Sequence, residues 1–268
     1  MRARVIHALL HLLDRQVVRE GDGRLLCKAD DLELASGEDG RPYVTAILAG
    51  PLALGPRVGG VPGRMMVAVT ELLRPEERPG PHRIDMAHVT GVGSAVTVDR
   101  SRPELALERW TREHVVSRIP GANHAPGREA EPAPGPGTGR PPAPAPEREP
   151  AMRLSGLIRR AVQDASGEVV GQVADVRLTQ DGPLLGRVQH AFAVSGLIVV
   201  PRHTGQLFGY ERAISGTGPW LVRTAVRALH RGSVLVPWEH VADLGGDPVR
   251  LRAVREELTP LRELSALE

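Results

Sequence analysis

Five arginines in one stretch of the chain could bind anions. They are Arg202, Arg212, Arg223, Arg227 and Arg231. The last three recur every fourth residue, so they form one stripe of the amphipathic helix that the sequence predicts over Pro219–Gly232. Guanidinium groups gathered on one face attract phosphates and carboxylates, which predicts binding of the RNA backbone or of an acidic protein. The stripe is also typical of the solvated side of an amphipathic helix, and both interpretations stay open.

Other residue patterns give no catalytic site. His7 and His11 have the spacing of two metal ligands on a helix, but no Glu-x-x-His partner or third carboxylate ligand accompanies them. Asp164, Asp175 and Glu239 are single acids without a partner spaced for acid–base catalysis. The chain has no phosphate-binding glycine loop, no serine nucleophile elbow and no dinucleotide fingerprint. We therefore expect no enzyme, no metal and no cofactor.

The composition fits two small domains with modest cores. A chain of 268 residues has room for two domains, and its 41% hydrophobic and 25% charged residues are typical of a globular protein. Only 3% of the residues are aromatic, so the cores must consist mainly of Val, Leu, Ile and Ala. The formal net charge of +2 is far below that of a dedicated nucleic-acid binder. Lys28 is the only lysine, a bias typical of a GC-rich bacterial genome.

We expect a cytoplasmic location. Cys27 is the only cysteine, which excludes an internal disulfide and a cysteine-based zinc cluster. Arg2 and Arg4 precede an apolar run, as in a signal peptide. However, His7 and His11 interrupt this run and no small-residue cleavage site follows. No stretch approaches the ~20 apolar residues of a membrane-spanning helix.

A segment rich in Pro, Gly and Ala divides the chain. Residues 120–150 lack large apolar side chains and many N–H donors, which predicts an extended, disordered linker. Residues 1–100 and 151–252 are then two domains. A helix is predicted over 101–119 after the first domain, and a helical tail over 253–268 after the second.

The two predicted domains resemble each other in sequence. Leu12–Leu34 aligns with Leu157–Leu178 after one single-residue gap. The matched pairs include Val17 with Val162, Gly23 with Gly167, Asp31 with Asp175 and Leu34 with Leu178. Similarity at this spacing indicates a tandem repeat, of which the first copy is the more degenerate.

Both copies predict the same succession of elements. A short strand, a glycine turn and a longer strand lead to Asp39-Gly40 or Asp181-Gly182, a pair that favours a hairpin turn. An apolar strand follows, and then an amphipathic helix, Met65–Arg74 in the first copy and Pro219–Gly232 in the second. The fold class is therefore mainly β with added helices. Short strands with glycine turns predict two small closed barrels, since closure leaves no exposed edge.

Two motifs of the second copy resemble those of the PRC-barrel family. Gly167–Leu178 reads Gly-Glu-Val-Val-Gly-Gln-Val-Ala-Asp-Val-Arg-Leu, and Val234–Val241 reads Val-Leu-Val-Pro-Trp-Glu-His-Val. The residues that carry the family signature are Gly171, Asp175, Pro237, Trp238 and Glu239. In the first copy, Cys27 replaces the second glycine, and Asp85-Met86-Ala87 stands in place of Pro-Trp-Glu.

The resemblance implies a small β-barrel that docks other proteins, as in a photosynthetic reaction-centre subunit and a ribosome maturation factor. We therefore expect a non-enzymatic adaptor or scaffold, in which two linked docking modules raise the effective concentration of their protein partners. The alternative is an RNA- or ribosome-associated role that uses the arginine stripe of residues 219–232. The five signature residues are expected to maintain the fold.

Overall fold

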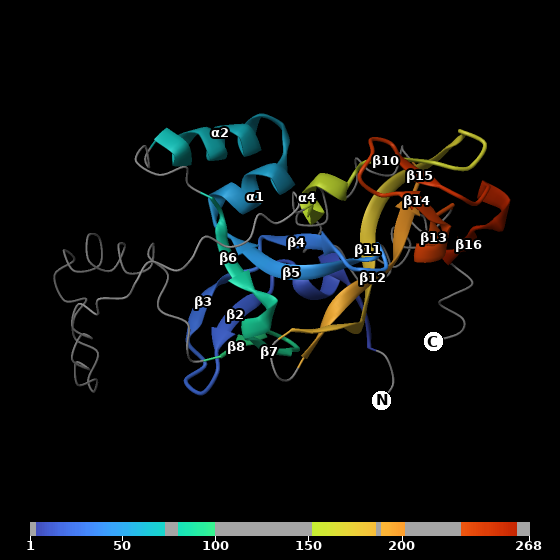
Figure 1. Ribbon diagram of the computed structural model, residues 1–268. Helices are drawn as coiled ribbons and strands as arrows, with labels where there is room; N and C mark the ends of the chain where they lie inside the picture. The colour runs from blue at the N-terminus through green and yellow to red at the C-terminus, as the bar shows by residue number, and fades with distance from the viewer. Residues whose placement is uncertain (1–3, 73–79, 100–151, 186–188, 202–231, 262–268) are drawn as a thin grey trace, which may run out of the picture.

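The computed structural model describes residues 4–72, 80–99, 152–185, 189–201 and 232–261 (Figure 1). Within these ranges the protein is mainly β with a few helices, which confirms the predicted fold class at this level. The predicted helix over 101–119, the predicted linker over 120–150 and residues 219–231 of the helix predicted over 219–232 lie outside the described residues.

The first repeat runs from β1 to β8. Its strands are β1 (Val5–His7), β2 (Gln16–Arg19), β3 (Leu25–Lys28), β4 (Asp31–Ser36), β5 (Pro42–Ala49), β6 (His82–Asp85), β7 (Val89–Val92) and β8 (Val96–Val98). Its helical elements are the π-helical turn η1 (Ala8–Leu12), α1 (Pro51–Val58), α2 (Gly60–Leu72) and the 3-10 turn η2 (Met86–His88). Gly40, with a φ of 74°, turns the chain between β4 and β5, so the hairpin predicted there is confirmed.

The second repeat runs from β9 to β15. Its strands are β9 (Met152–Arg153), β10 (Ala161–Gln163), β11 (Val169–Leu185), β12 (Gln189–Val200), β13 (Val234–Pro237), β14 (Val241–Asp243) and β15 (Val249–Leu251). Its helical elements are α4 (Leu154–Leu157) and the 3-10 turn η6 (Trp238–His240).

The segment after β15 differs from the predicted helical tail. It has a 3-10 turn, η7 (Arg255–Glu257), and a two-residue strand, β16 (Thr259–Pro260), which pairs with β13. Leu258 between them is buried in the core. The start of the expected helix is therefore replaced by a segment that buries Leu258 and pairs with the edge of β13. Residues 262–268 lie outside the described ranges.

The hairpin turn predicted at Asp181-Gly182 is wrong. β11 continues through these residues and pairs with β12 as far as Leu185 opposite Gln189. A Cβ atom on Gly182 would lie 2.6 Å from the carbonyl oxygen of Ala191. The glycine therefore permits a close approach of two strands instead of a turn.

Equivalent strands pair in the same way in both repeats. β4, β5 and β6 form an antiparallel ladder, as do β11, β12 and β13. β2 runs parallel to β8, and β10 runs parallel to β15. Even the strand bulge before Leu34 has its counterpart before Leu178. The sequence repeat is thus also a repeat of strand pairing.

β5 and β12 join the two repeats into one sheet of twelve strands, which curls into half a barrel. Tyr43 of β5 pairs with Ala193 of β12. The next residues, Val44 and Val194, pair with the matched leucines of β4 and β11, so Tyr43 and Ala193 are equivalent positions. An approximate two-fold axis therefore passes near this pair. A separate sheet of four strands, β3-β2-β8-β7, is open.

The first strand of each repeat pairs with the other repeat. β1 lies beside β11, with Ile6 opposite Leu178. β9 lies beside β4, with Met152 opposite Leu34. α4, which follows β9, lies close to β4 in Figure 1. One hydrophobic core then extends through both repeats, and Phe192 is its largest fully buried side chain.

α1 and α2 form a helical hairpin between β5 and β6, with α1 lying between α2 and the sheet (Figure 1). The two helices touch at glycines, since a Cβ atom on Gly63 would lie 2.2 Å from the carbonyl oxygen of Gly55. Gly63 is the buried residue of α2. Residues 65–72 of the helix predicted over Met65–Arg74 thus lie in α2, which packs against α1; residues 73 and 74 lie outside the described ranges.

Candidate functional site

Asp175, one of the five residues on which the resemblance to PRC barrels rests, holds the first turn of η1. Its carboxylate accepts the N–H of Leu9 at 2.9 Å and the N–H of Val176 at 2.7 Å. The nearby amides of Ala8 and Leu10 also favour the charged form of this carboxyl group and lower its pKa. Because η1 belongs to the first repeat and β11 to the second, Asp175 acts as a helix cap that connects the repeats.

Asp31 makes the same connection in the reverse direction. Its carboxylate accepts the N–H of Leu32 at 2.9 Å, the N–H of Ser155 at 2.9 Å and the hydroxyl of Ser155 at 2.5 Å. Ser155 lies in α4, at the start of the second repeat, and Asp31 is fully buried. The two aspartates that the sequence alignment matches therefore fasten each repeat to the other.

Burial raises the pKa of Asp175 to about 6, although the backbone amides that donate to the carboxylate act in the opposite direction. His7 Nδ1 lies 4.0 Å from Asp175 Oδ2. This pKa links the junction between the repeats to pH, because the carboxyl group ionises near 3.8 when it is exposed to water.

Between about pH 4 and pH 6 the free energy of unfolding should fall as the pH rises. In this range folded Asp175 still binds a proton that the unfolded chain has released, so the contribution is lost as the pH passes the folded pKa of about 6. The expected change is about 2 kcal/mol. Urea unfolding of the wild type and of Asp175→Asn at several pH values isolates this difference, and His7→Gln should retain it. A difference between the wild type and the Asp175→Asn variant that does not vary with pH would contradict the assignment.

The remaining signature residues lie along β11 and at the end of β13. Pro237 pairs with Gly196 of β12, and Trp238 is half-buried against the core. Glu239 is exposed in η6. Gly171 lies where β11 approaches the end of β12. Their role in maintaining the fold stays a prediction.

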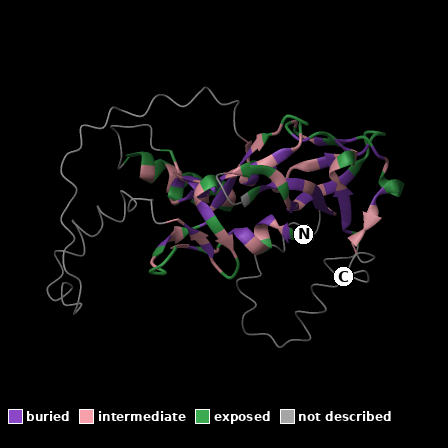
Figure 2. Ribbon diagram, turned by 60° about the horizontal axis from the view of Figure 1, so that its bottom comes forward, coloured by how far each residue is buried: buried purple, intermediate pink, exposed green. Residues whose placement is uncertain are grey.

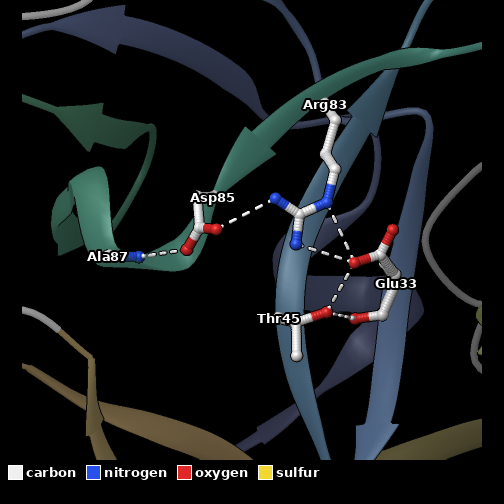
Figure 3. A network of polar contacts seen from close by, with 5 residues as sticks. All are labelled: Glu33, Thr45, Arg83, Asp85 and Ala87. Atoms are coloured by element: carbon white, nitrogen blue, oxygen red, sulfur yellow. Dashed lines mark hydrogen bonds and ion pairs between the residues drawn. The ribbon is translucent and has the colours of Figure 1, made fainter. Parts of the chain in front are cut away.

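A polar network occupies the place in the first repeat where the second has Pro237 (Figure 3). Arg83 donates from Nε and Nη2 to Glu33 Oε1, at 2.9 and 2.8 Å. Its Nη1 donates to Asp85 Oδ2 at 2.9 Å, and the N–H of Ala87 donates to Asp85 Oδ1 at 3.0 Å. Thr45 Oγ1 donates to the same Glu33 oxygen at 2.8 Å. Each charge has a partner within the network, so it fixes the β6–η2 corner.

The second repeat has no copy of this network. The strand pairing places Arg177 at the position of Glu33, Leu235 at that of Arg83 and Ser195 at that of Thr45. The Ser195 hydroxyl is buried and has no hydrogen-bond partner among the described residues. The two repeats therefore present different surfaces despite their shared strand pairing.

His7, just before η1, and His11, within η1, lie next to each other. The backbone N–H of His7 donates to His11 Nδ1 at 2.9 Å, and the two ring centroids are 5.7 Å apart. Among the residues that the structure describes, no group of three or more His, Cys, Asp and Glu side chains could hold a metal ion. The five arginines predicted to bind anions, Arg202, Arg212, Arg223, Arg227 and Arg231, lie outside the described residues.

The exposed face of α2 is a surface that the sequence analysis did not single out. Val61, Met65, Val69 and Leu72 are 67%, 65%, 49% and 79% exposed. Exposed residues accordingly mark this helix in Figure 2. A surface helix normally turns polar residues toward water, so this row is the candidate functional site. The sequence signal was present, because α2 carries apolar residues on the side opposite Gly63 as well as beside it.

A comparison with protein-family models and with curated proteins finds no match for this chain. Within the described ranges, no helix is both long and apolar enough to cross a membrane.

Proposed function

We propose that this protein is a non-enzymatic cytoplasmic scaffold that binds another protein chain through α2. The observation that carries the proposal is the row of exposed apolar side chains Val61, Met65, Val69 and Leu72. Removal of apolar surface from water stabilises a complex by roughly 25 cal/mol per Å². Contiguous apolar surface on an otherwise polar exterior is typical of protein-binding sites.

The rest of the fold supports this role. The reciprocal caps at Asp31 and Asp175 and the shared sheet give α2 a rigid base. In this proposal the two repeats are PRC-type barrels. The PRC-barrel proteins that they resemble dock other proteins. The RNA-associated alternative depends on arginines outside the described residues, so the α2 row favours the protein-docking role.

A photo-cross-linking experiment on the full chain tests the proposal. A photoreactive phenylalanine analogue replaces Met65, or Glu38 as the control in the exposed β4–β5 turn, in the producing cells. Protein cross-links are expected at position 65 and absent at position 38. Equal labelling at both positions, or no protein adduct at position 65, would overturn the docking role.

A further inference from the structure

We propose that α2 binds α2 of a second copy of this chain in an antiparallel pair, which makes the protein a homodimer. The inference rests on the proposed function, because it names the partner of the same surface. Three observations carry it: the spacing of the apolar residues, the position of the two charges beside them, and the place of α2 on the molecule.

The exposed apolar residues of α2 have the spacing of a coiled-coil seam. Val61, Met65, Ala68 and Leu72 are separated by four, three and four residues and are all exposed. This alternation keeps one stripe of a helix facing another helix and fits knobs-into-holes packing. The spacing therefore points to a helix as the occupant.

The charges of α2 favour a second α2 over an unrelated helix. Arg64 and Glu71 are both exposed and lie seven residues apart, so they occupy the same edge of the seam. In an antiparallel pair, Met65 packs against Ala68 of the second copy, and Val61 packs against its Leu72. The same register places Arg64 beside Glu71 of the second copy, and the two-fold axis repeats this ion pair.

A parallel pair lacks this complementarity. Parallel coiled coils bring opposite edges of the two seams together, so Arg64 would then face Val69, and Glu71 would face no charge of α2. An antiparallel pair is also isologous: the same patch serves both copies and the assembly closes as a dimer.

Among the described residues, the position of α2 leaves its exposed face open to this contact. α2 lies at the outer side of the hairpin, and α1 separates it from the sheet (Figure 1). Its thirteen residues span about 20 Å, enough for the two seam layers on each side of the axis. An interface of this length is small, so a dimer that dissociates at micromolar concentrations is expected.

Sedimentation velocity of the full chain over a concentration series tests the proposal. The wild type is expected to dimerise, and Met65→Glu, which places two carboxylates in the seam, is expected to be monomeric. Arg64→Glu and Glu71→Arg should each raise the dissociation constant on the order of tenfold, because both ion pairs become repulsive. A mixture of these two variants should form heterodimers, and the double variant should dimerise like the wild type. Glu38→Arg is the charge control, and circular dichroism checks that each variant is folded.

Three results would overturn the proposal. They are a wild type that stays monomeric, a dimer that survives Met65→Glu, and a dimer that does not respond to charge reversal. Binding of a monomeric wild type to phosphatidylcholine–phosphatidylglycerol vesicles, abolished by Met65→Glu, would assign the row to a lipid surface instead. If the wild type is monomeric and position 65 cross-links to a different protein, the homodimer is wrong and the proposed scaffold role is retained. A monomer without any protein cross-link would sink both.

Discussion

Asp31→Ala is expected to lower the free energy of unfolding by about 3 kcal/mol. The substitution removes the acceptor of two backbone amides and one hydroxyl; the Leu32 amide is buried, and the amide and hydroxyl of Ser155 are part-buried. A buried donor without an acceptor has lost its hydrogen bond to water without a replacement. Urea unfolding followed by circular dichroism measures the change.

Two further variants make this result specific. Asp39→Ala removes an exposed aspartate whose carboxylate accepts the N–H of Arg41 in a turn, and it should cost about 1 kcal/mol at most. Ser155→Ala, combined with Asp31→Ala in a double-mutant cycle, should show coupling across the two repeats. A loss for Asp31→Ala no larger than that for Asp39→Ala would show that the cap does not hold the repeats together.

Gly171→Ala is expected to destabilise the protein by about 3 kcal/mol or more. A Cβ atom at this position would lie 2.2 Å from the carbonyl oxygen of Val200 and 2.9 Å from its carbonyl carbon. These are backbone atoms of β12, which cannot rotate away as a side chain could. The strands must separate to admit one methyl group, and thermal unfolding should show a large decrease in Tm.

The matched controls for Gly171 lie in the first repeat. Gly80→Ala adds a methyl group where no atom lies within 4 Å, and should leave the Tm close to that of the wild type. Cys27→Ala, at the position that corresponds to Gly171, should also be tolerated. β3 ends at Lys28, before β4 begins at Asp31, so the first repeat has no continuous strand at the point where β11 presses on β12. An equal decrease in Tm for Gly171→Ala and Gly80→Ala would contradict the explanation that a methyl group at Gly171 forces β11 and β12 apart.

The sequence predicts the repeat and its strands because local patterns determine them. The alignment of Asp31 with Asp175 holds in three dimensions, since both side chains cap a helical turn. Asp39-Gly40 forms the expected turn, where a positive φ is required. Asp181-Gly182 has the same residues but continues a strand. The dipeptide alone does not distinguish a turn from a close approach to Ala191, which depends on the partner strand.

The first strand of each repeat, β1 or β9, pairs with a strand of the other repeat, and this could not be predicted from the sequence. β1 and β9 precede equivalent helical turns, and β4 and β11 offer equivalent edges. Pairing within a repeat or between repeats would therefore use nearly the same contacts. Hydrophobic periodicity specifies which face is buried, but not which of two equivalent edges receives a short strand. Asp31 and Asp175 hold the pairing between repeats that the structure adopts. In the sequence, the only feature that marks either aspartate is its alignment with the other.

The exposed face of α2 was hidden for a related reason. The apolar content of Met65–Leu72 predicts a helix that packs on the core, as apolar helices usually do. Instead, α2 packs against α1 through Gly63 and Val67, which approach Gly55, and Val61, Met65, Val69 and Leu72 face outward. Which side of a helix is covered depends on such tertiary contacts.

The reciprocal placement of β1 and β9 also governs when this chain can fold. Val5 emerges from the ribosome first, yet its strand partner Thr179 lies in the second half of the sequence. At roughly 5–20 residues per second, β1 waits on the order of ten seconds or more for that partner. Until residues 152–155 have been synthesised, the edge of β4 that receives β9 stays open, and Asp31 lacks the donors of Ser155. Synthesis of the second half is therefore a kinetic condition for completing the strand pairing of the first.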